Sequence, residues 1–547
     1  MLRRRWQFPL FLIPLLFLIL FFFYPLGNIL GLSLTVEAVS TVLDRSYFAA
    51  IIAFTAWQAL LSTALTMLIG VPAAYIFARY QFPLKSLLRA LFTVPFVMPT
   101  VVVAAAFRAL LGPSGPVNDL LMSWLDLARA PIRLERTLTI ILIAHVFYNV
   151  SIVVRLLGGF WANLSPRLVE AAQMLGASPL QAFRRVTLPV LSPALFGAGL
   201  LVYLFTFTSF GVVLLLGGPQ YSTIETEIYR QYVTFLNLDV AALLSLFQIV
   251  FTFVLMSIYA RWQRKGMVPI DFRPHDDTSR RPTSGAEKIV IYGMLSGLSL
   301  LLVLPLAALL WRSLSGAEGE FTLAHYLALP ESRRGSITFI PPLAAIRNSL
   351  GYALLTVVAA GGLGLISASW LSRPGRWRAW LDPVFMLPLG ASAVTLGFGY
   401  VVSFDRLRTS PMLVLIAHTL VALPFVVRAI LPVQQGIPAA LREAASVLGA
   451  SPRQVWRRVD LPIVGRALLV GAVFAFTVSM GEFGATSFIV RPNSGYLTVP
   501  IAIQRFLGQA GSDNFGQALA MSAILMLVCA AGFIAIERFR VADVGEF

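Results

Sequence analysis

Few residues of the types that carry out covalent chemistry occur in this sequence, and none shows the spacing that such chemistry needs. The four histidines, His145, His275, His325 and His418, are scattered along the chain, and Cys529 is the only cysteine. A lone cysteine excludes a disulfide framework and a cysteine-based metal site. The phosphate loop GxxxxGK[ST] and the HExxH, CxxC and GxSxG motifs are all absent. We therefore expect no catalytic residue and no metal site, and the sequence does not favour an intramembrane hydrolase.

Glu482 has the residue type and the position to interact with a cation. It lies in the apolar stretch VSMGEFGATSF, residues 478–488, and is the only carboxylate that we expect well inside a membrane span. Ionisable groups at such depth are costly, and they mark substrate paths or pair with a neighbour. Two roles stay open: helping a cation across the membrane, or a structural pairing with Arg108 or a histidine.

The elements that must position these residues are membrane helices. The chain has 547 residues, of which 58% are hydrophobic and 12% charged, with a mean hydropathy of +0.81. Such a composition is too apolar for a soluble domain, and a span needs about 20 apolar residues. The sequence predicts twelve spans, near residues 10–33, 51–78, 88–111, 137–160, 191–218, 239–261, 288–314, 345–370, 380–404, 411–434, 464–490 and 515–537.

The distribution of the net charge of +17 predicts an orientation for these spans. With the N-terminus in the cytoplasm, the segments that fall inside hold 26 of the 42 Lys and Arg residues, as the positive-inside rule requires. This orientation explains the charge without nucleic acid. We expect a multi-pass protein of a bacterial-type plasma (inner) membrane with both termini in the cytoplasm.

One polar sequence occurs twice. EAAQMLGASPLQAFRRVTLP (Glu170–Pro189, the first motif) and EAASVLGASPRQVWRRVDLP (Glu443–Pro462, the second motif) agree at 14 of 20 positions at an offset of 273 residues. In the predicted orientation both motifs face the cytoplasm. The serine-proline pairs and the central glycines predict two short helices with a bend in each motif.

The repeat extends beyond the motifs. Residues 141–155 match residues 414–428, and Phe-Gly recurs at 210–211 and 483–484 at the same offset. An even number of spans separates the copies, so we expect a parallel repeat with its pseudo-twofold axis along the membrane normal. The predicted division is a first unit at 1–262, a cytoplasmic linker at 263–288 and a second unit at 289–547. The fold class is an all-α polytopic membrane protein with two six-helix halves.

The repeat also relates the remaining polar residues of the spans. His145 and His418 occupy matched positions, and Ser209 is the counterpart of Glu482. Each histidine could bond across helices for structure or face a substrate. Tyr148 and Asn149 follow His145, whereas the second unit has Val421 and Ala422 there, so a substrate role would be asymmetric. The candidate path residues are Glu482, Ser209, His145, His418, Tyr148 and Asn149.

Two interpretations of the motifs compete. Each motif is either an amphipathic element under the lipid headgroups, with its arginines held by anionic lipid, or a helix offered to a groove of a soluble partner. Lipid tolerates any basic amphipathic sequence, whereas the bend, the small residues and the spacing recur here. The repetition therefore favours a partner that binds twice.

The two motifs resemble the EAA loops of type I ABC importer permeases. The residues that fit this pattern, with the adjoining arginines, are Glu170, Ala171, Ala172, Gly176, Arg184, Arg185, Leu188 and Pro189, and Glu443, Ala444, Ala445, Gly449, Arg457, Arg458, Leu461 and Pro462. In that family the loop forms a coupling helix that sits in a cleft of an ATP-binding subunit. The resemblance covers nearly the whole chain and implies two cytoplasmic ABC ATPase subunits, which bind ATP and Mg²⁺, and no cofactor on this chain.

The fused two-unit arrangement is similar to that of the thiamine and ferric-iron permeases. GGPQYSTIETEIY (Gly217–Tyr229) and AHVFYN (Ala144–Asn149) look most like thiamine permeases, while Gly481–Asn493 fits fused iron-type permeases equally well. The resemblance implies an importer that receives a small nutrient, thiamine-type or ferric iron, from an extracytoplasmic binding protein. The alternatives are an importer of another solute such as polyamine, a secondary transporter with parallel repeats, and a membrane-anchored scaffold or sensor.

Overall fold

The computed structural model describes residues 3–44, 46–165, 167–265, 279–316, 319–331, 341–372, 375–408, 410–491 and 494–539. These residues form helices joined by short connections, with two isolated β-bridges and no strand within the described ranges. The helices up to the linker are α1 (Arg3–Leu18), α2 (Tyr24–Ser33), α3 (Val36–Asp44), α4 (Ser46–Arg79), α5 (Lys85–Val97), α6 (Thr100–Leu111), α7 (Pro116–Leu125), α8 (Leu138–Ala162), α9 (Arg167–Met174), α10 (Pro179–Ala182), the π-helical turn η2 (Phe183–Thr187), α11 (Leu188–Phe207), α12 (Ile224–Val233) and α13 (Leu238–Lys265).

The helices after the linker repeat this order. They are α14 (Gly285–Ser313), α15 (Ala324–Leu327), α16 (Pro342–Leu371), α17 (Arg376–Gly390), α18 (Ala393–Ser403), α19 (Pro411–Gly436), α20 (Ala439–Val447), α21 (Pro452–Val455), the π-helical turn η7 (Trp456–Asp460), α22 (Leu461–Gly481), α23 (Gly484–Ile489), α24 (Val499–Leu507) and α25 (Ser512–Phe539).

The number of spans agrees with the sequence-based expectation. Eleven helices in the described ranges are long and apolar enough to cross a membrane, or twelve if the bent pair α17 and α18 counts as one span. The observed helix boundaries differ from the predicted spans at four places. The predicted spans 88–111 and 380–404 are each broken, the first at Met98–Pro99 and the second by a bend of 97°, while spans five and eleven end at Phe207 and Gly481. Proline explains the first break, because Pro99 has no N–H for the helix ladder.

The two halves pack in equivalent ways around α8 and α19. These two helices have the largest buried shares of their apolar windows, 67% and 72%, so they form the centre of each half. Gly70 lets α4 approach α8, because a Cβ there would lie 2.7 Å from Cβ of Val153. Gly364 does the same for α16 and α19, where the nearest atom would be Cγ1 of Val426 at 2.6 Å. The expected twofold repeat is therefore confirmed in the packing.

The first helix of each half packs against the other half. Phe11 of α1 stacks on Trp370 of α16 with ring centroids 3.9 Å apart, and α2 packs against α18. Likewise α14 packs on α6 and α5 of the first half. The two halves are thus interleaved rather than placed side by side as separate blocks.

The end of the linker is attached to the first half. Residues 266–278 of the predicted linker lie outside the described residues, and residues 285–288 are already part of α14. Arg280 donates to the backbone of Arg79, lies 4.9 Å from the ring centroid of Tyr80 and pairs with Glu287. The bond with Glu287 raises the pKa of the Arg280 guanidinium. These contacts place the start of α14 beside the end of α4.

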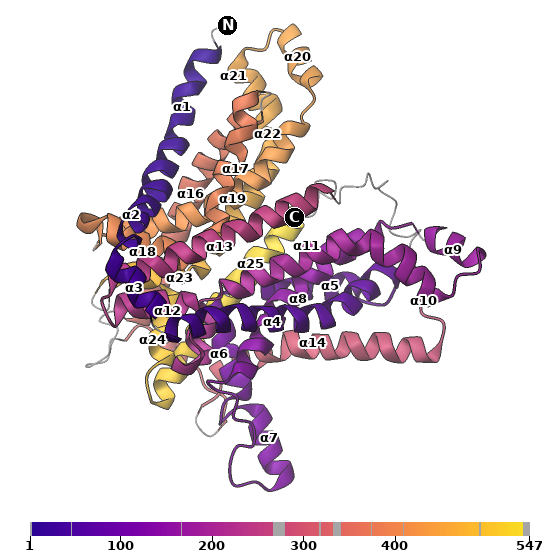
Figure 1. Ribbon diagram of the computed structural model, residues 1–547, viewed down its shortest axis with the longest axis vertical. Helices are drawn as coiled ribbons and strands as arrows, with labels where there is room; N and C mark the ends of the chain where they lie inside the picture. Colours follow the sequence, from indigo (N-terminus) through magenta and orange to yellow (C-terminus); the bar gives the residue numbers. More distant parts are fainter. Residues whose placement is uncertain are drawn as a thin grey trace.

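The helices form two arms that diverge from a common region, as Figure 1 shows. One arm contains α4, α5, α8, α11 and α14 and ends in α9 and α10. The other contains α1, α16, α17, α19 and α22 and ends in α20 and α21. The arms meet where α12, α18, α23 and α24 lie, so the two repeated motifs occupy the far ends of separate arms.

Candidate docking motifs and membrane path

Each repeated motif forms two short helices with a glycine at the bend, as the sequence predicts. In the first motif α9 ends before Gly176, and in the second α20 ends before Gly449. The two glycines have φ values of +87° and +83°, a left-handed conformation that costs other residues free energy. Ser178 and Ser451 then cap α10 and α21, each in a capping box with the glutamine three residues later. The same local chemistry therefore builds both bends.

The tip of each motif exposes apolar side chains. Met174 and Leu175 are 90% exposed, and their counterparts Val447 and Leu448 are 86% and 87% exposed. Apolar pairs at matched positions of two protruding tips are typical of surfaces that bind a partner.

The other predicted motif residues lie around these tips. Glu170, Glu443 and the arginine pairs 184–185 and 457–458 are exposed, and none makes an ion pair within the described part of the chain. Ala171, Ala444, Leu188, Pro189 and Pro462 are exposed, whereas Ala172, Ala445 and Leu461 are partly buried. The structure thus brings the residues of each motif together on one protruding element, with the glutamate and the arginine pair of each motif exposed.

The second helix of each motif continues directly into a membrane span. Leu188-Pro189 and Leu461-Pro462 do not interrupt the helices, because helical structure runs from Pro179 to Phe207 and from Pro452 to Gly481. The π-helical turns η2 and η7 explain why, since the N–H of Leu188 bonds to the carbonyl of Phe183 five residues back. The extra residue in the turn makes room for Pro189, which has no N–H. A displacement of a motif is therefore passed to the span through continuous helix.

The two motifs differ in how their first helix is held. Arg442 of α20 donates to Asp460 of η7 with Nε 2.7 Å from Oδ1. The corresponding residues of the first motif are Val169 and Thr187, which cannot form this pair. The second motif is thus clamped by an ion pair that the first motif lacks.

Both span histidines hydrogen-bond across helices. His145 lies between Ser62 of α4 and Ser209, with each ring nitrogen 2.9 Å from a hydroxyl oxygen. His418 lies 2.7 Å from Ser479 and 3.0 Å from the hydroxyl of Thr486. Both rings are buried. In each half the histidine thus joins the central helix to the segment where span five or eleven ends, which agrees with the structural interpretation of the pair.

Glu482 caps the short helix α23. Its carboxylate accepts from the backbone N–H of Ala485 at 2.7 Å and of Thr486 at 3.0 Å, and also from the Thr486 hydroxyl. Nε2 of His418 lies 3.5 Å from Oε2. Of the two pairings that we considered, the structure shows the histidine, because Arg108 instead pairs with Glu135. In the first half the residue at the position of Glu482 is Ser209, which carries a hydroxyl in place of the carboxylate.

The remaining two path candidates also have internal partners. The hydroxyl of Tyr148 donates to the backbone carbonyl of Met98 at 3.2 Å, at the break between α5 and α6. The side chain of Asn149 donates to the carbonyl of His145, one turn earlier, at 2.8 Å. Tyr148 thus lies beside the broken span, whereas Asn149 bonds within its own helix.

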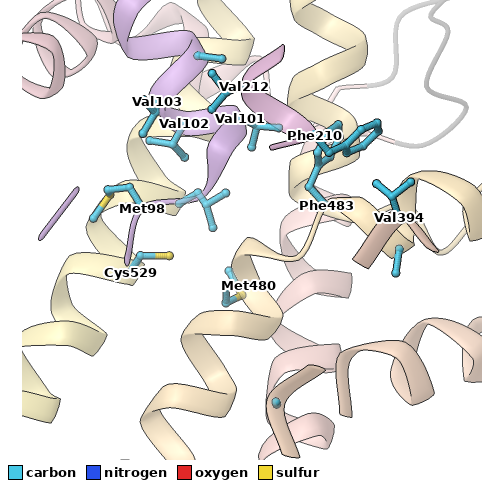
Figure 2. Packing of buried hydrophobic residues seen from close by; sticks show 14 of the residues in the cluster. Met98, Val101, Val102, Val103, Phe210, Val212, Val394, Met480, Phe483 and Cys529 are labelled. Carbon is cyan, nitrogen blue, oxygen red and sulfur yellow. The ribbon is translucent and has the colours of Figure 1, made fainter. Parts of the chain in front are cut away.

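An aromatic pair lies where the two halves meet. Phe210 and Phe483, related by the 273-residue offset, stack with ring centroids 5.5 Å apart (Figure 2). The glycine after each phenylalanine packs against a broken span. A Cβ on Gly211 would lie 2.2 Å from Oγ1 of Thr100, and one on Gly484 would lie 2.8 Å from Cβ of Ala393. The pseudo-twofold axis therefore passes near these rings, between the ends of spans five and eleven.

Two buried carboxylates of α12 were missed in the sequence. Glu225 and Glu227 are fully buried, although they lie in a segment between predicted spans. Their spacing within IETEIY, next to apolar residues on both sides, was the available signal. Glu227 is fully bonded, to Tyr47, Gln231 and Arg230, and fastens α12 to the start of α4.

Comparison with known proteins identifies the family. Residues 67–266 and 360–540 each match the family described as binding-protein-dependent transport system inner membrane component. The probable ABC transporter permease protein y4fN of Sinorhizobium fredii is 26% identical over 539 residues, covering 93% of this chain and 91% of the relative. The thiamine transport system permease protein ThiP of Escherichia coli is 26% identical over 514 residues, covering 91% and 90%.

One further relative and one solved structure also match. ThiP of Brucella abortus is 25% identical over 495 residues, covering 89% of this chain and 86% of the relative. A crystal structure of a bacterial alginate ABC transporter, in complex with an alginate-bound periplasmic protein, matches with 22% identity and a TM-score of 0.41, over 48% of this chain and 96% of that chain. The chain belongs to the binding-protein-dependent transport system inner membrane component family, and is a multi-pass inner-membrane ABC importer permease in which two family units are fused.

Proposed function

We propose that this permease imports thiamine or a closely related nutrient, using ATP that two separate cytoplasmic ATPase subunits hydrolyse. An extracytoplasmic binding protein delivers the substrate to the face opposite the two motifs. The observation that carries the proposal is the matched pair of exposed apolar tips, Met174 with Leu175 and Val447 with Leu448, at the ends of the two arms.

The geometry of the motifs supports two docked ATPase subunits. Each tip presents two apolar side chains together with exposed charges, which suits a helix bound in a groove. Because α10 and α21 continue into α11 and α22, a change in the distance between the two ATPase subunits moves the far ends of both arms. ATP binding and hydrolysis thereby act on the equilibrium between two permease conformations through differential binding.

The distribution of basic residues supports the proposed orientation. The motifs, the linker and both termini face the cytoplasm, where the basic segments gather. The region where α12, α18 and α24 meet then lies toward the outer face. In the described conformation the arms diverge at the motif end (Figure 1), which corresponds to a permease open toward the cytoplasm.

The relatives support thiamine as the substrate. Several similar permeases, from Brucella, Escherichia coli and other species, are thiamine transport proteins, and they match along nearly the whole chain. This is the substrate class that the segments Gly217–Tyr229 and Ala144–Asn149 favour in the sequence.

The test is ATP hydrolysis by the chain reconstituted in proteoliposomes with its candidate ATPase and binding protein. We expect thiamine, and not ferric citrate, to stimulate hydrolysis. The double variant Glu170→Arg/Glu443→Arg should lose ATPase binding, because it reverses one charge in each motif. The matched control Glu37→Arg, an exposed glutamate of α3, should retain it. Failure of the wild type to bind any ATPase would refute the importer mechanism, whereas stimulation by ferric citrate alone would refute only the substrate.

A further inference from the structure

Glu225 of α12 is a buried carboxylate with fewer partners than its neighbour Glu227. Its Oε1 accepts from the side-chain amide of Gln248 on α13. Its Oε2 has no hydrogen-bond partner among the described residues. Glu227, two residues further on, shows the contrast, because Tyr47, Gln231 and Arg230 satisfy both of its oxygens. Buried polar atoms without a partner are rare in folded proteins, and a half-bonded buried carboxylate is costly, so Glu225 needs an explanation that Glu227 does not.

Further unpartnered polar atoms gather beside Glu225. Oε1 of Gln248 and Oγ1 of Thr252 have no partner within the described ranges, and these two residues share one face of α13, one turn apart. Met256, the next turn on this face, would lie 3.9 Å from a Cβ on Gly390 at the end of α17. The face thus points toward the bend between α17 and α18, which belongs to the other half of the chain.

The bend contributes the N-terminus of α18 to the same place. Ser392, which caps α18 by accepting from the N–H groups of Val394 and Thr395, also lies within side-chain hydrogen-bond reach of the Glu225 carboxylate, whose pKa burial raises to about 8. The hydroxyl of Thr395 is buried without a partner among the described residues. A helix N-terminus favours negative charge, and broken membrane helices are where transporters bind ions and substrates. The cluster therefore combines a carboxylate, which a bound cation would keep ionised, with four polar atoms of α13 and α18.

Aromatic rings continue from Glu225 along α12. Tyr229 and Tyr232 follow it by four and seven residues and therefore lie on the same face of the helix. The Tyr229 ring lies 5.5 Å from Phe210 and 5.3 Å from Phe488. The Tyr232 ring lies 5.4 Å from Phe488 and 6.1 Å from Phe398. The Glu225 carboxylate thus lies next to a cluster of aromatic rings where the two halves of the chain meet.

This combination suits one class of ligand. Aromatic faces attract cations and stack with flat rings, a carboxylate neutralises one positive charge, and the amide and hydroxyl groups bond to polar substituents. We propose that Glu225, with Gln248, Thr252 and the Tyr229–Tyr232 face, forms a site on the permease itself that binds an aromatic organic cation. The site rests on the proposed import function and assigns the substrate class to which thiamine, with its positively charged thiazolium ring, belongs.

Among the described residues the site occurs once, although the fold repeats. The N–H of Ile224 bonds to Thr55 at 3.0 Å, and the N–H of Val499 bonds to Ser349 at 2.8 Å, so α12 and α24 are equivalent at an offset of 275 residues. Pro500 then stands where α12 has Glu225, and Gln504 where it has Tyr229. One substrate cation per transport cycle needs only one carboxylate. Access to it requires that α12 and α18 separate, which couples the site to the angle between the arms.

The test compares uptake of radiolabelled thiamine with uptake of its neutral thiophene analogue. The permease is reconstituted with its ATPase and the same saturating binding protein for every variant, so that differences arise in the permease. Glu225→Gln keeps the size of the side chain and the acceptor for Gln248 but removes the charge. We expect it to lower thiamine uptake at least tenfold and to change uptake of the analogue less than twofold. Glu225→Asp, which restores the charge, should recover part of the thiamine uptake.

Glu227→Gln is the matched control, since it neutralises an equally buried carboxylate of the same helix. It should affect thiamine and the neutral analogue to the same extent. Unchanged thiamine uptake in Glu225→Gln, or an equal loss for both ligands, would overturn the binding site while leaving thiamine import intact. Absence of thiamine uptake by the wild type, with uptake of ferric citrate, would overturn the proposed substrate and with it this site.

Discussion

Removing the apolar tips of the two motifs should weaken ATPase binding by a calculable amount. Leu175 and Leu448 are 90% and 87% exposed, so a partner groove that covers them gains nearly their whole side-chain burial. Substitution by alanine removes three carbon groups, each worth about 0.8 kcal/mol when buried. The loss is therefore about 2.4 kcal/mol per motif, which corresponds to an increase in Kd of about 60-fold.

The measurement is the dissociation constant of nucleotide-free, monomeric ATPase for the permease in nanodiscs, by biolayer interferometry. Monomeric ATPase is chosen because a dimer would bind both motifs at once and mask the loss at one of them. Leu175→Ala and Leu448→Ala should each weaken one class of site about 60-fold, by the arithmetic above. The double variant should weaken both.

The control is Trp124→Ala, which removes an equally exposed apolar side chain, 81% exposed, from α7 at the other end of the molecule. Its Kd should equal that of the wild type. A change of less than about threefold in the double variant, less than 1 kcal/mol, would show that the tips lie in lipid headgroups or solvent. The docking mechanism would then be refuted, and the interfacial interpretation of the motifs would replace it.

Three further predictions concern single contacts. Gly211→Ala places a Cβ against Thr100 and should lower the free energy of unfolding by about 1–3 kcal/mol. The measurement is the thermal midpoint in nanodiscs, which should fall. Gly293→Ala, where a Cβ would meet nothing within 4 Å, should leave the midpoint unchanged. Arg442→Ala removes the clamp of the second motif, and should raise protease cleavage there but not in the first motif; equal cleavage in both would contradict the asymmetry. Glu482→Gln keeps the fold but loses a charged cap, and should lower the thermal midpoint without altering the ratio of thiamine to neutral-analogue uptake; a changed ratio would place this carboxylate on the path.

The sequence predicts the repeated elements well because repetition is visible without knowledge of packing. The two motifs, their bends at Gly176 and Gly449 and the number of spans all follow from local patterns, and the structure agrees with them. The interleaving of α1 and α14 could not be predicted. A membrane helix is apolar toward lipid and toward protein alike, so its hydrophobic pattern does not reveal which neighbour it packs against.

Features that depend on backbone detail were also beyond prediction. Leu188-Pro189 reads as a helix stop, since proline normally ends a helix, and only the π-helical turn before it keeps the helix continuous. The sequence identifies Glu482 as a charged residue in an apolar stretch. It does not predict the short helix α23, whose backbone N–H groups are partners of the Glu482 carboxylate. The sequence does not single out Glu225, because α12 lies between the predicted spans. The burial of this carboxylate depends on the packing of α12 against α13 and α18.

The two halves are alike at the motif ends and differ where they meet, and this difference separates the proposed ATPase docking from the proposed substrate binding. At the motif end the two halves are nearly identical, because the same kind of ATPase must bind twice: the tips expose matched apolar pairs and the bends use the same glycine and serine. Where the halves meet, the polar residues differ, with Glu225 against Pro500 and Ser209 against Glu482. A single asymmetric substrate gains nothing from a second copy of its site, and a second buried carboxylate would add a desolvation cost. Joining the two units in one chain allows the motif ends to stay alike while the region between the halves diverges, as the proposed pair of ATPase subunits and the proposed single cationic substrate require.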